Sequence, residues 1–141
     1  MAKAANFILF LIFSFINFSV QAQSLTGSWE GKMGSEVLQI NIEQKNGALC
    51  GYTHDIEIND SSSYCSAKFT GTYLLDESKW YLQGYEFITR SGDHVLMNIK
   101  LWFDPMDRPG VLRASVTQNN VSFMMHDFDA DISLLVRKSK K

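Results

Sequence analysis

The chain has 141 residues, of which 45% are hydrophobic, and its formal net charge is −2. This length suits one folded domain, and so mild a charge gives no reason to expect a polyanionic or polycationic partner. We also exclude nucleic acid as a partner, because the aromatic residues are not interleaved with Arg and Lys and the basic C-terminal residues form only a short tail, typical of a solubilising end.

Residues 1–22 have the pattern of a secretory signal peptide. Lys3 provides a positive n-region, an apolar run extends from Phe7 to Val20, and Val20-Gln21-Ala22 fits a small-x-small cleavage site. The run is short for a membrane anchor, so an uncleaved single-pass helix is the weaker alternative. The residue directly after the cleavage site is Gln23 and not Cys, which argues against a lipoprotein. We therefore expect a cleaved signal peptide and one β-barrel domain over residues 23–141, secreted or periplasmic and without membrane contact.

After the signal segment, the sequence predicts an all-β fold. Short stretches with apolar and β-branched residues at alternate positions, clearest in Val37–Glu43, are separated at near-regular intervals by turn sequences such as Asn46-Gly47 and Asn119-Asn120. Eight such turns imply nine strands, and no stretch has the periodicity of an amphipathic helix. We expect an antiparallel up-and-down meander that closes into a barrel of about eight or nine strands.

The alternation predicts which residues face the barrel interior and which face outward. The interior set either fills the barrel or leaves a pocket for one ligand, and the outer aromatic residues suggest a partner protein or self-association. The predicted interior residues are Trp29, Met33, Leu38, Ile40, Ile42, Phe69, Tyr73, Val95, Met97, Ile99, Leu101, Phe103, Val121, Phe123, Met125, Ile132, Leu134 and Val136. The predicted outer residues are Tyr52, Tyr64, Tyr81, Tyr85, Leu96 and Trp102.

Cys50 and Cys65 are the only two cysteines, and both lie in the part expected to be exported. An oxidising compartment favours pairing, and the two residues lie on the two arms of one hairpin with a turn at Asn59–Ser63. With a tight central turn Cys50 would face a residue well beyond Cys65, so pairing needs a longer, asymmetric loop or a bulge. We predict a disulfide, with two free buried thiols as the alternative.

Metal ligands are sparse in this sequence. The three histidines each neighbour an Asp, but alternating strand direction places His126 at the opposite end of the barrel from His54 and His94, so we expect no three-histidine zinc site. Asp127, Asp129 and Asp131 have an alternate spacing that hard cations such as calcium use. An ordinary solvated turn is the favoured interpretation of these acids, because the residues that complete an EF-hand loop are missing.

Catalytic motifs are absent from the sequence. It contains no Gly-x-Ser-x-Gly, no His-Glu-x-x-His and no phosphate-binding glycine loop. We therefore expect a protein that is not an enzyme and uses no cofactor. At the end of the barrel opposite Asp127, the polar candidates for acid and base chemistry are Asp55, Glu57, Arg90, Asp93 and His94.

The segment Leu25-Thr26-Gly27-Ser28-Trp29 carries a Gly-x-Trp motif on the first predicted strand. It resembles the calycin superfamily of lipocalins, fatty-acid-binding proteins and avidins, which implies an up-and-down barrel that holds a small ligand. The likeness to avidins extends to Gly34-Ser35 and to Gly47–Tyr52. It implies that Ser35 contacts the ligand, whereas Gly31, Thr53 and Asp55 replace three other ligand-binding residues of the avidin pattern, so biotin is not the expected ligand.

Two classes of function are consistent with these observations. The first is binding of a small apolar ligand in the barrel, with Trp29, Ser35, Tyr52 and Arg90 as candidate binding residues. The second is a protein-interaction or inhibitor module that uses the outer aromatic face of the sheet. The volume left inside the barrel distinguishes them, because a filled interior leaves no room for a ligand.

Overall fold

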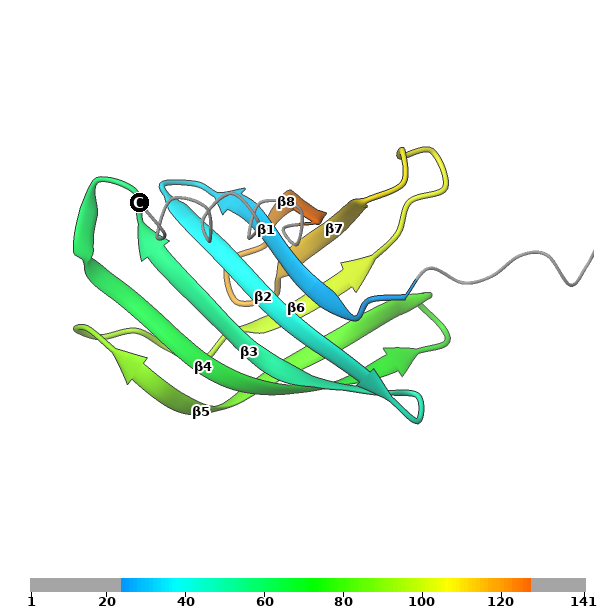
Figure 1. Cartoon of the computed structure of the whole chain (residues 1–141), viewed down its shortest axis with the longest axis horizontal. Helices are drawn as coiled ribbons and strands as arrows, with labels where there is room; N and C mark the ends of the chain where they lie inside the picture. Colours follow the sequence, from blue (N-terminus) through cyan, green and yellow to red (C-terminus); the bar gives the residue numbers. More distant parts are fainter. Residues whose placement is uncertain (1–23, 128–141) are drawn as a thin grey trace, which may run out of the picture.

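A computed structural model describes residues 24–127, which form a closed barrel of eight antiparallel strands (Figure 1). Each strand pairs with the next along the chain, and β8 closes the barrel against β1. This confirms the predicted all-β, up-and-down meander barrel. The strands are β1 (Gly27–Met33), β2 (Glu36–Lys45), β3 (Ala48–Glu57), β4 (Asp60–Leu74), β5 (Lys79–Arg90), β6 (Asn98–Trp102), β7 (Val111–Val116) and β8 (Val121–Asp127).

Several predictions concern residues that lie outside the described range. They are the signal peptide at residues 1–22, a ninth strand containing Ile132, Leu134 and Val136, and two of the three acids of the candidate cation site, Asp129 and Asp131. Within residues 24–127, no helix is long and apolar enough to cross a membrane.

Turn residues with positive φ set the register of the hairpins. Asn46 and Gly47 have φ values of 52° and 77°, as a two-residue turn of the primed type requires, and they bring Lys45 opposite Ala48. The turn between β3 and β4 differs from its predicted position at Asn59–Ser63. It is formed by Ile58 and Asn59, and residues 60–63 already belong to β4.

The barrel interior is an apolar core. Most of the predicted interior residues within the described range are buried or pack against the core, including Leu38 and Leu101, which are 0% exposed. Two are exposed, because they lie where the barrel opens: Tyr73 is 43% and Val95 is 68% exposed. The ten largest fully buried side chains are Leu25, Leu38, Ile40, Leu49, Leu82, Ile99, Leu101, Leu112, Met125 and Val116.

The two ends of the barrel differ in chemistry. At the end where β1 turns into β2 and β3 into β4, a pocket is lined by Glu36, Asp55, Asp93 and His94 among other residues, and we call it the acidic mouth. This end of the barrel, with the β1–β2 and β3–β4 turns, lies at the left in Figure 1. At the opposite end, where β4 turns into β5 and β6 into β7, aromatic side chains surround a second pocket, which we call the aromatic mouth.

Candidate functional site

The acidic mouth is a pocket of about 250 Å³ between the β1–β2 turn and the β5–β6 and β7–β8 connections. Carboxylates and a histidine share its wall with methionine and valine side chains. The pocket therefore combines negative charge with an apolar surface, as small-molecule sites commonly do. Its lining residues are Met33, Glu36, Asp55, Asp93, His94, Val95, Met97, Val116, Gln118 and Asn119.

Asp55 reaches this pocket from the inner face of β3. Side chains alternate along a strand, so Asp55 shares the inner face with Thr53, and both are buried. In the sheet Asp55 lies opposite Leu38 of β2 and Cys65 of β4. Only 3% of Asp55 is exposed, which is rare for a carboxylate that lacks a full set of partners.

One oxygen of the Asp55 carboxylate has no hydrogen-bond partner among the described residues. Oδ2 lies 3.7 Å from Nδ1 of His94, whereas Oδ1 is buried and accepts no hydrogen bond. The pKa of Asp55 is raised from 3.8 to about 6, mainly by burial and then by the negative charge of Glu36, while the charge of His94 opposes the change. Asp55 therefore presents a desolvated acceptor with unused hydrogen-bonding capacity to the pocket.

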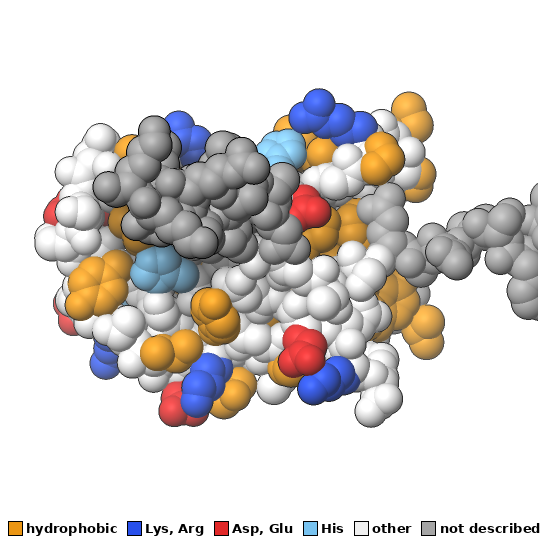
Figure 2. Space-filling model, viewed as in Figure 1, with side chains coloured by type: hydrophobic (Ala, Val, Ile, Leu, Met, Phe, Trp, Pro, Cys, Tyr) orange, Lys and Arg blue, Asp and Glu red, His pale blue; other side chains and the backbone are white. Residues whose placement is uncertain are grey.

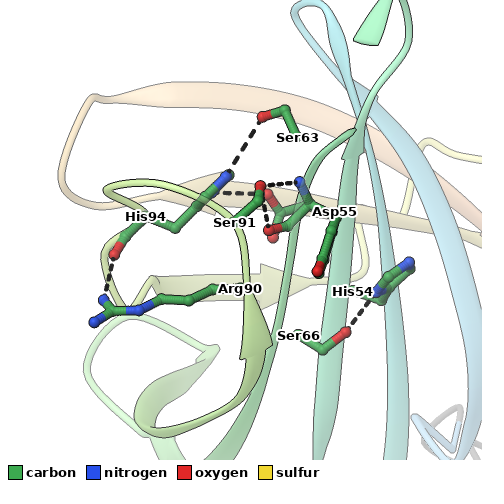
Figure 3. Close-up of polar contacts among 8 residues, drawn as sticks. His54, Asp55, Ser63, Ser66, Arg90, Ser91 and His94 are labelled. Atoms are coloured by element: carbon green, nitrogen blue, oxygen red, sulfur yellow. Dashed lines mark hydrogen bonds and ion pairs between the residues drawn. The ribbon is translucent and has the colours of Figure 1, made fainter. Parts of the chain in front are cut away.

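His94 is held beside Asp55 by contacts within the β5–β6 connection (Figure 3). The backbone carbonyl of His94 accepts a hydrogen bond from Nη1 of Arg90 at 3.1 Å, and the Arg90 guanidinium stacks on the ring of Phe87 at 4.2 Å. Ser91 ties the same segment to β4, because its hydroxyl accepts from the backbone N–H of Tyr64 at 2.8 Å and lies 3.2 Å from the Tyr64 carbonyl. The position of His94 thus depends on the whole connection.

Ser63, His94 and Asp55 follow one another in the order of a nucleophile, a base and an orienting acid (Figure 3). The Ser63 hydroxyl lies 3.5 Å from Nε2 of His94, and Nδ1 of His94 lies 3.7 Å from Asp55. Proton transfer in such a relay works over ~2.6–3.2 Å. Both separations are longer, and Ser63 faces an open depression of about 430 Å³ that adjoins the acidic mouth and shares Asp93 and His94 with it. The Ser63–His94–Asp55 series is therefore more widely spaced than the hydrogen bonds of a proton relay.

A second polar pair lies beside the mouth on the neighbouring strands. Nδ1 of His54 on β3 is hydrogen-bonded to the Ser66 hydroxyl on β4, where the pairing of β4 with β5 is irregular (Figure 3). This pair satisfies the buried Ser66 side chain. It does not supply the missing partner of Asp55.

The structure brings two of the four predicted ligand-binding residues to the end of the barrel that holds the acidic mouth, although neither lines the pocket. Ser35 lies in the β1–β2 turn, where its carbonyl accepts from the backbone N–H of Ile58 at 2.8 Å, and Arg90 holds His94. Tyr52 lies on the outer side of β3 and is 46% exposed. Trp29 is buried toward the other end of the barrel, where its indole N–H donates to the Leu25 carbonyl at 3.0 Å.

Sequence reasoning placed Asp55 and His94 at one end of the barrel but assigned neither of them a role in binding. A usable signal was present: Asp55 is in phase with Thr53 and Gly51, on the side of the strand that faces the interior. An acid at such a position is either paired or functional. Glu36 gave no comparable signal, because it lies at the start of a strand next to a turn.

The predicted disulfide between Cys50 and Cys65 is wrong, and both thiols are free. The β3–β4 turn at Ile58 and Asn59 places Cys50 opposite Thr70, five residues beyond Cys65. Cys50 is exposed on the outer side of the wall, whereas Cys65 is buried. Burial, together with the charge of Asp55, raises the pKa of the Cys65 thiol to about 11, so this thiol stays protonated.

No metal centre is visible in the described part of the chain, where no group of three or more His, Cys, Asp or Glu side chains is arranged to hold a metal ion. Asp127 ends β8, and its backbone N–H donates to the Gly110 carbonyl at 3.3 Å. His126 lies on β8, which pairs with β1 and β7, whereas His54 lies on β3, which pairs with β2 and β4. The cation site with Asp129 and Asp131 stays a prediction.

Comparison with known proteins gives no relative from which to transfer a role. No protein-family model, no curated protein and no solved structure matches the chain. Function is therefore inferred from the acidic mouth itself.

Proposed function

We propose that this protein is a non-enzymatic ligand-binding barrel that holds a small organic cation in its acidic mouth. The observation that carries the proposal is Asp55, whose Oδ1 is buried in the pocket wall without a hydrogen-bond partner among the described residues. A buried acceptor that lacks a partner costs ~1–3 kcal/mol or more. A protonated amine or amidine of a ligand supplies both the missing donor and the missing positive charge.

The remaining wall of the pocket defines the rest of the ligand. Met33, Val95, Met97 and Val116 provide an apolar surface beside the carboxylates. A volume of about 250 Å³ is small for a ligand site, so the ligand has a short apolar body attached to its cationic group. Glu36 and Asp93 add negative charge around the entrance, which attracts a cation from solution.

The expected binding of an apolar ligand inside the barrel is refined by this proposal. Leu38, Ile40, Leu82 and Leu101 are at most 1% exposed and pack against one another in the centre of the barrel. We therefore place the ligand at the mouth of the barrel and above the core. This is compatible with a lipocalin- or avidin-like protein that is secreted or periplasmic, as residues 1–22 suggest.

Calorimetric titration with n-butylammonium and benzamidinium tests the proposal, with n-butanol and butyrate as neutral and anionic probes of similar size. We expect binding of the two cations only. Asp55→Asn weakens it by about 10-fold or more, because a hydrogen bond to a charged group contributes ~1.5–3 kcal/mol. The matched control is Glu43→Gln, which removes an exposed carboxylate from the far end of β2.

Equal binding of butanol or butyrate, or unchanged binding by Asp55→Asn, contradicts the proposal. Failure of every cation to bind would favour the alternative of a protein-interaction or inhibitor module. That alternative has less support, because on the face seen in Figure 2 the hydrophobic side chains lie in separate groups between polar and charged ones. Protein interfaces more commonly have a continuous apolar centre.

A further inference from the structure

The aromatic mouth is a pocket of about 400 Å³ at the end of the barrel opposite Asp55. It lies between the β4–β5 turn and the β6–β7 connection. Aromatic residues make up half of its lining, and the other half includes a hydroxyl and two carboxylates. The lining residues are Tyr73, Ser78, Trp80, Trp102, Phe103, Asp104, Pro105 and Asp107.

The aromatic rings form a fixed platform. Tyr73 and Trp80 are opposite each other on β4 and β5, and their rings meet edge to face at 5.1 Å between centroids. Phe103 meets Trp29 in the same way at 6.0 Å, and Trp29 is 5% exposed and anchored by its indole N–H. Such contacts restrict ring motion. The rings therefore present a preformed apolar surface at the opening, with Tyr73 43% exposed.

The carboxylates beside this platform are held in place by one arginine. Nε and Nη2 of Arg113 donate to the two oxygens of Asp107 at 2.7 and 2.9 Å, and Asp104 lies 3.6 Å from Nε. Hydrogen bonding to Arg113 keeps the pKa of Asp107 below its ordinary value. Asp104 also accepts from the backbone N–H of Met106 at 2.9 Å. The mouth therefore carries oriented carboxyl acceptors next to aromatic faces.

The charges around the aromatic mouth balance. Arg113 and Lys79 offset Asp104 and Asp107, and Nζ of Lys79 lies 4.3 Å from the centroid of the Trp102 ring. One aromatic face thus already has a cation of the protein itself. A cationic or anionic ligand gains little from such a site. A neutral ligand that has both an apolar C–H face and several hydroxyl groups matches the rings and the acceptors together.

We propose that the aromatic mouth binds a neutral saccharide, with a pyranose ring stacked on Trp80 and in contact with Tyr73, and its hydroxyls donating to Asp104 and Asp107. This site is independent of the acidic mouth. The volume of about 400 Å³ admits a short saccharide and excludes a long chain from the pocket itself. Ser78, at the rim of the pocket, provides a hydroxyl for a further contact.

Tryptophan fluorescence tests this proposal, because Trp80 and Trp102 line the pocket and Trp29 contacts Phe103 beneath it. The probes are maltose, cellobiose, lactose and chitobiose, followed by a glycan array. Sorbitol, which has hydroxyls but no ring, and choline, a quaternary cation, serve as chemical controls. We expect a saturable fluorescence change with at least one neutral saccharide at millimolar concentration and none with sorbitol or choline.

Trp80→Ala is expected to weaken the saccharide by about 10-fold, the size of a lost aromatic contact with its buried area. Trp80 packs against the core, so Tyr73→Ala is the second variant, since Tyr73 is more exposed and its loss perturbs the fold less. Tyr85→Ala, an exposed aromatic on β5 that is not part of this pocket, is the matched control and leaves binding unchanged. Absence of binding across the saccharides and the array, or binding of choline instead, would overturn the proposal.

Discussion

Burial of Asp55 makes the stability of the fold depend on pH. The carboxyl has its ordinary pKa of 3.8 in the unfolded chain and about 6 in the folded protein. Between these two values the unfolded chain has released the proton and the folded protein has not, so rising pH favours unfolding. Above pH 6 the cost is constant, at ~3 kcal/mol from ~1.4 kcal/mol per pKa unit. The buried carboxylate of Asp55 thus lowers the free energy of unfolding, as is common for functional residues.

Asp55→Asn tests this cost. We expect the free energy of unfolding to rise by up to ~3 kcal/mol above pH 6, with the gain shrinking as the pH falls from about 6 toward 3.8. The figure is an upper value, because the new amide also needs partners. Urea unfolding of both proteins at several pH values measures it. A variant that is equally stable or less stable than the wild-type protein throughout this range shows that the Asp55 carboxylate is not under strain.

At the scale of the element, the β3–β4 hairpin shows how the position of a turn determines which residues of two strands lie opposite each other. The sequence placed the turn at Asn59–Ser63, and its actual position at Ile58 and Asn59 lengthens β4 to 15 residues. The expectation that a tight turn takes Cys50 past Cys65 is confirmed by the pairing of Cys50 with Thr70. The oxidising compartment expected for an exported protein favoured a disulfide. The strand register and the alternation of side chains along each strand, however, put the two thiols on opposite sides of the barrel wall.

The same hairpin predicts unequal reactivity of the two thiols. Cys50 is exposed, whereas Cys65 is 3% exposed and its pKa is raised to about 11. N-ethylmaleimide should therefore modify Cys50 in the native protein and reach Cys65 only after unfolding, because the thiolate is the reactive form. Mass spectrometry of the intact protein counts the modifications. An unreduced native protein that takes up no label, and two labels after reduction, would indicate a disulfide instead.

At the scale of the whole molecule, the near-regular spacing of strand and turn sequences was enough to predict the barrel. The alternation of apolar residues along the strands predicted most of its core. Tyr73 and Val95 were assigned to the interior and are exposed, because alternation along a strand does not tell where the barrel wall ends. Strand direction placed Asp55, Asp93 and His94 at one end of the barrel, but the pockets that form the two mouths were beyond prediction for the same reason. Each is built by connections from distant parts of the chain, such as the β5–β6 segment that places His94 beside Asp55.

The pKa of Asp55, followed by NMR of its carboxyl carbon with and without n-butylammonium, tests the central claim most directly. Besides the ligand, the charged groups that act on this pKa are Glu36 of β2, which raises it, and His94, which lowers it. We predict a midpoint of about 6 in the free protein and a lower one with the cation bound, because a positive charge at Oδ1 favours the ionised form. n-Butanol leaves the midpoint in place. A midpoint near 3.8 in the free protein, or one that saturating n-butylammonium does not lower, would contradict the account.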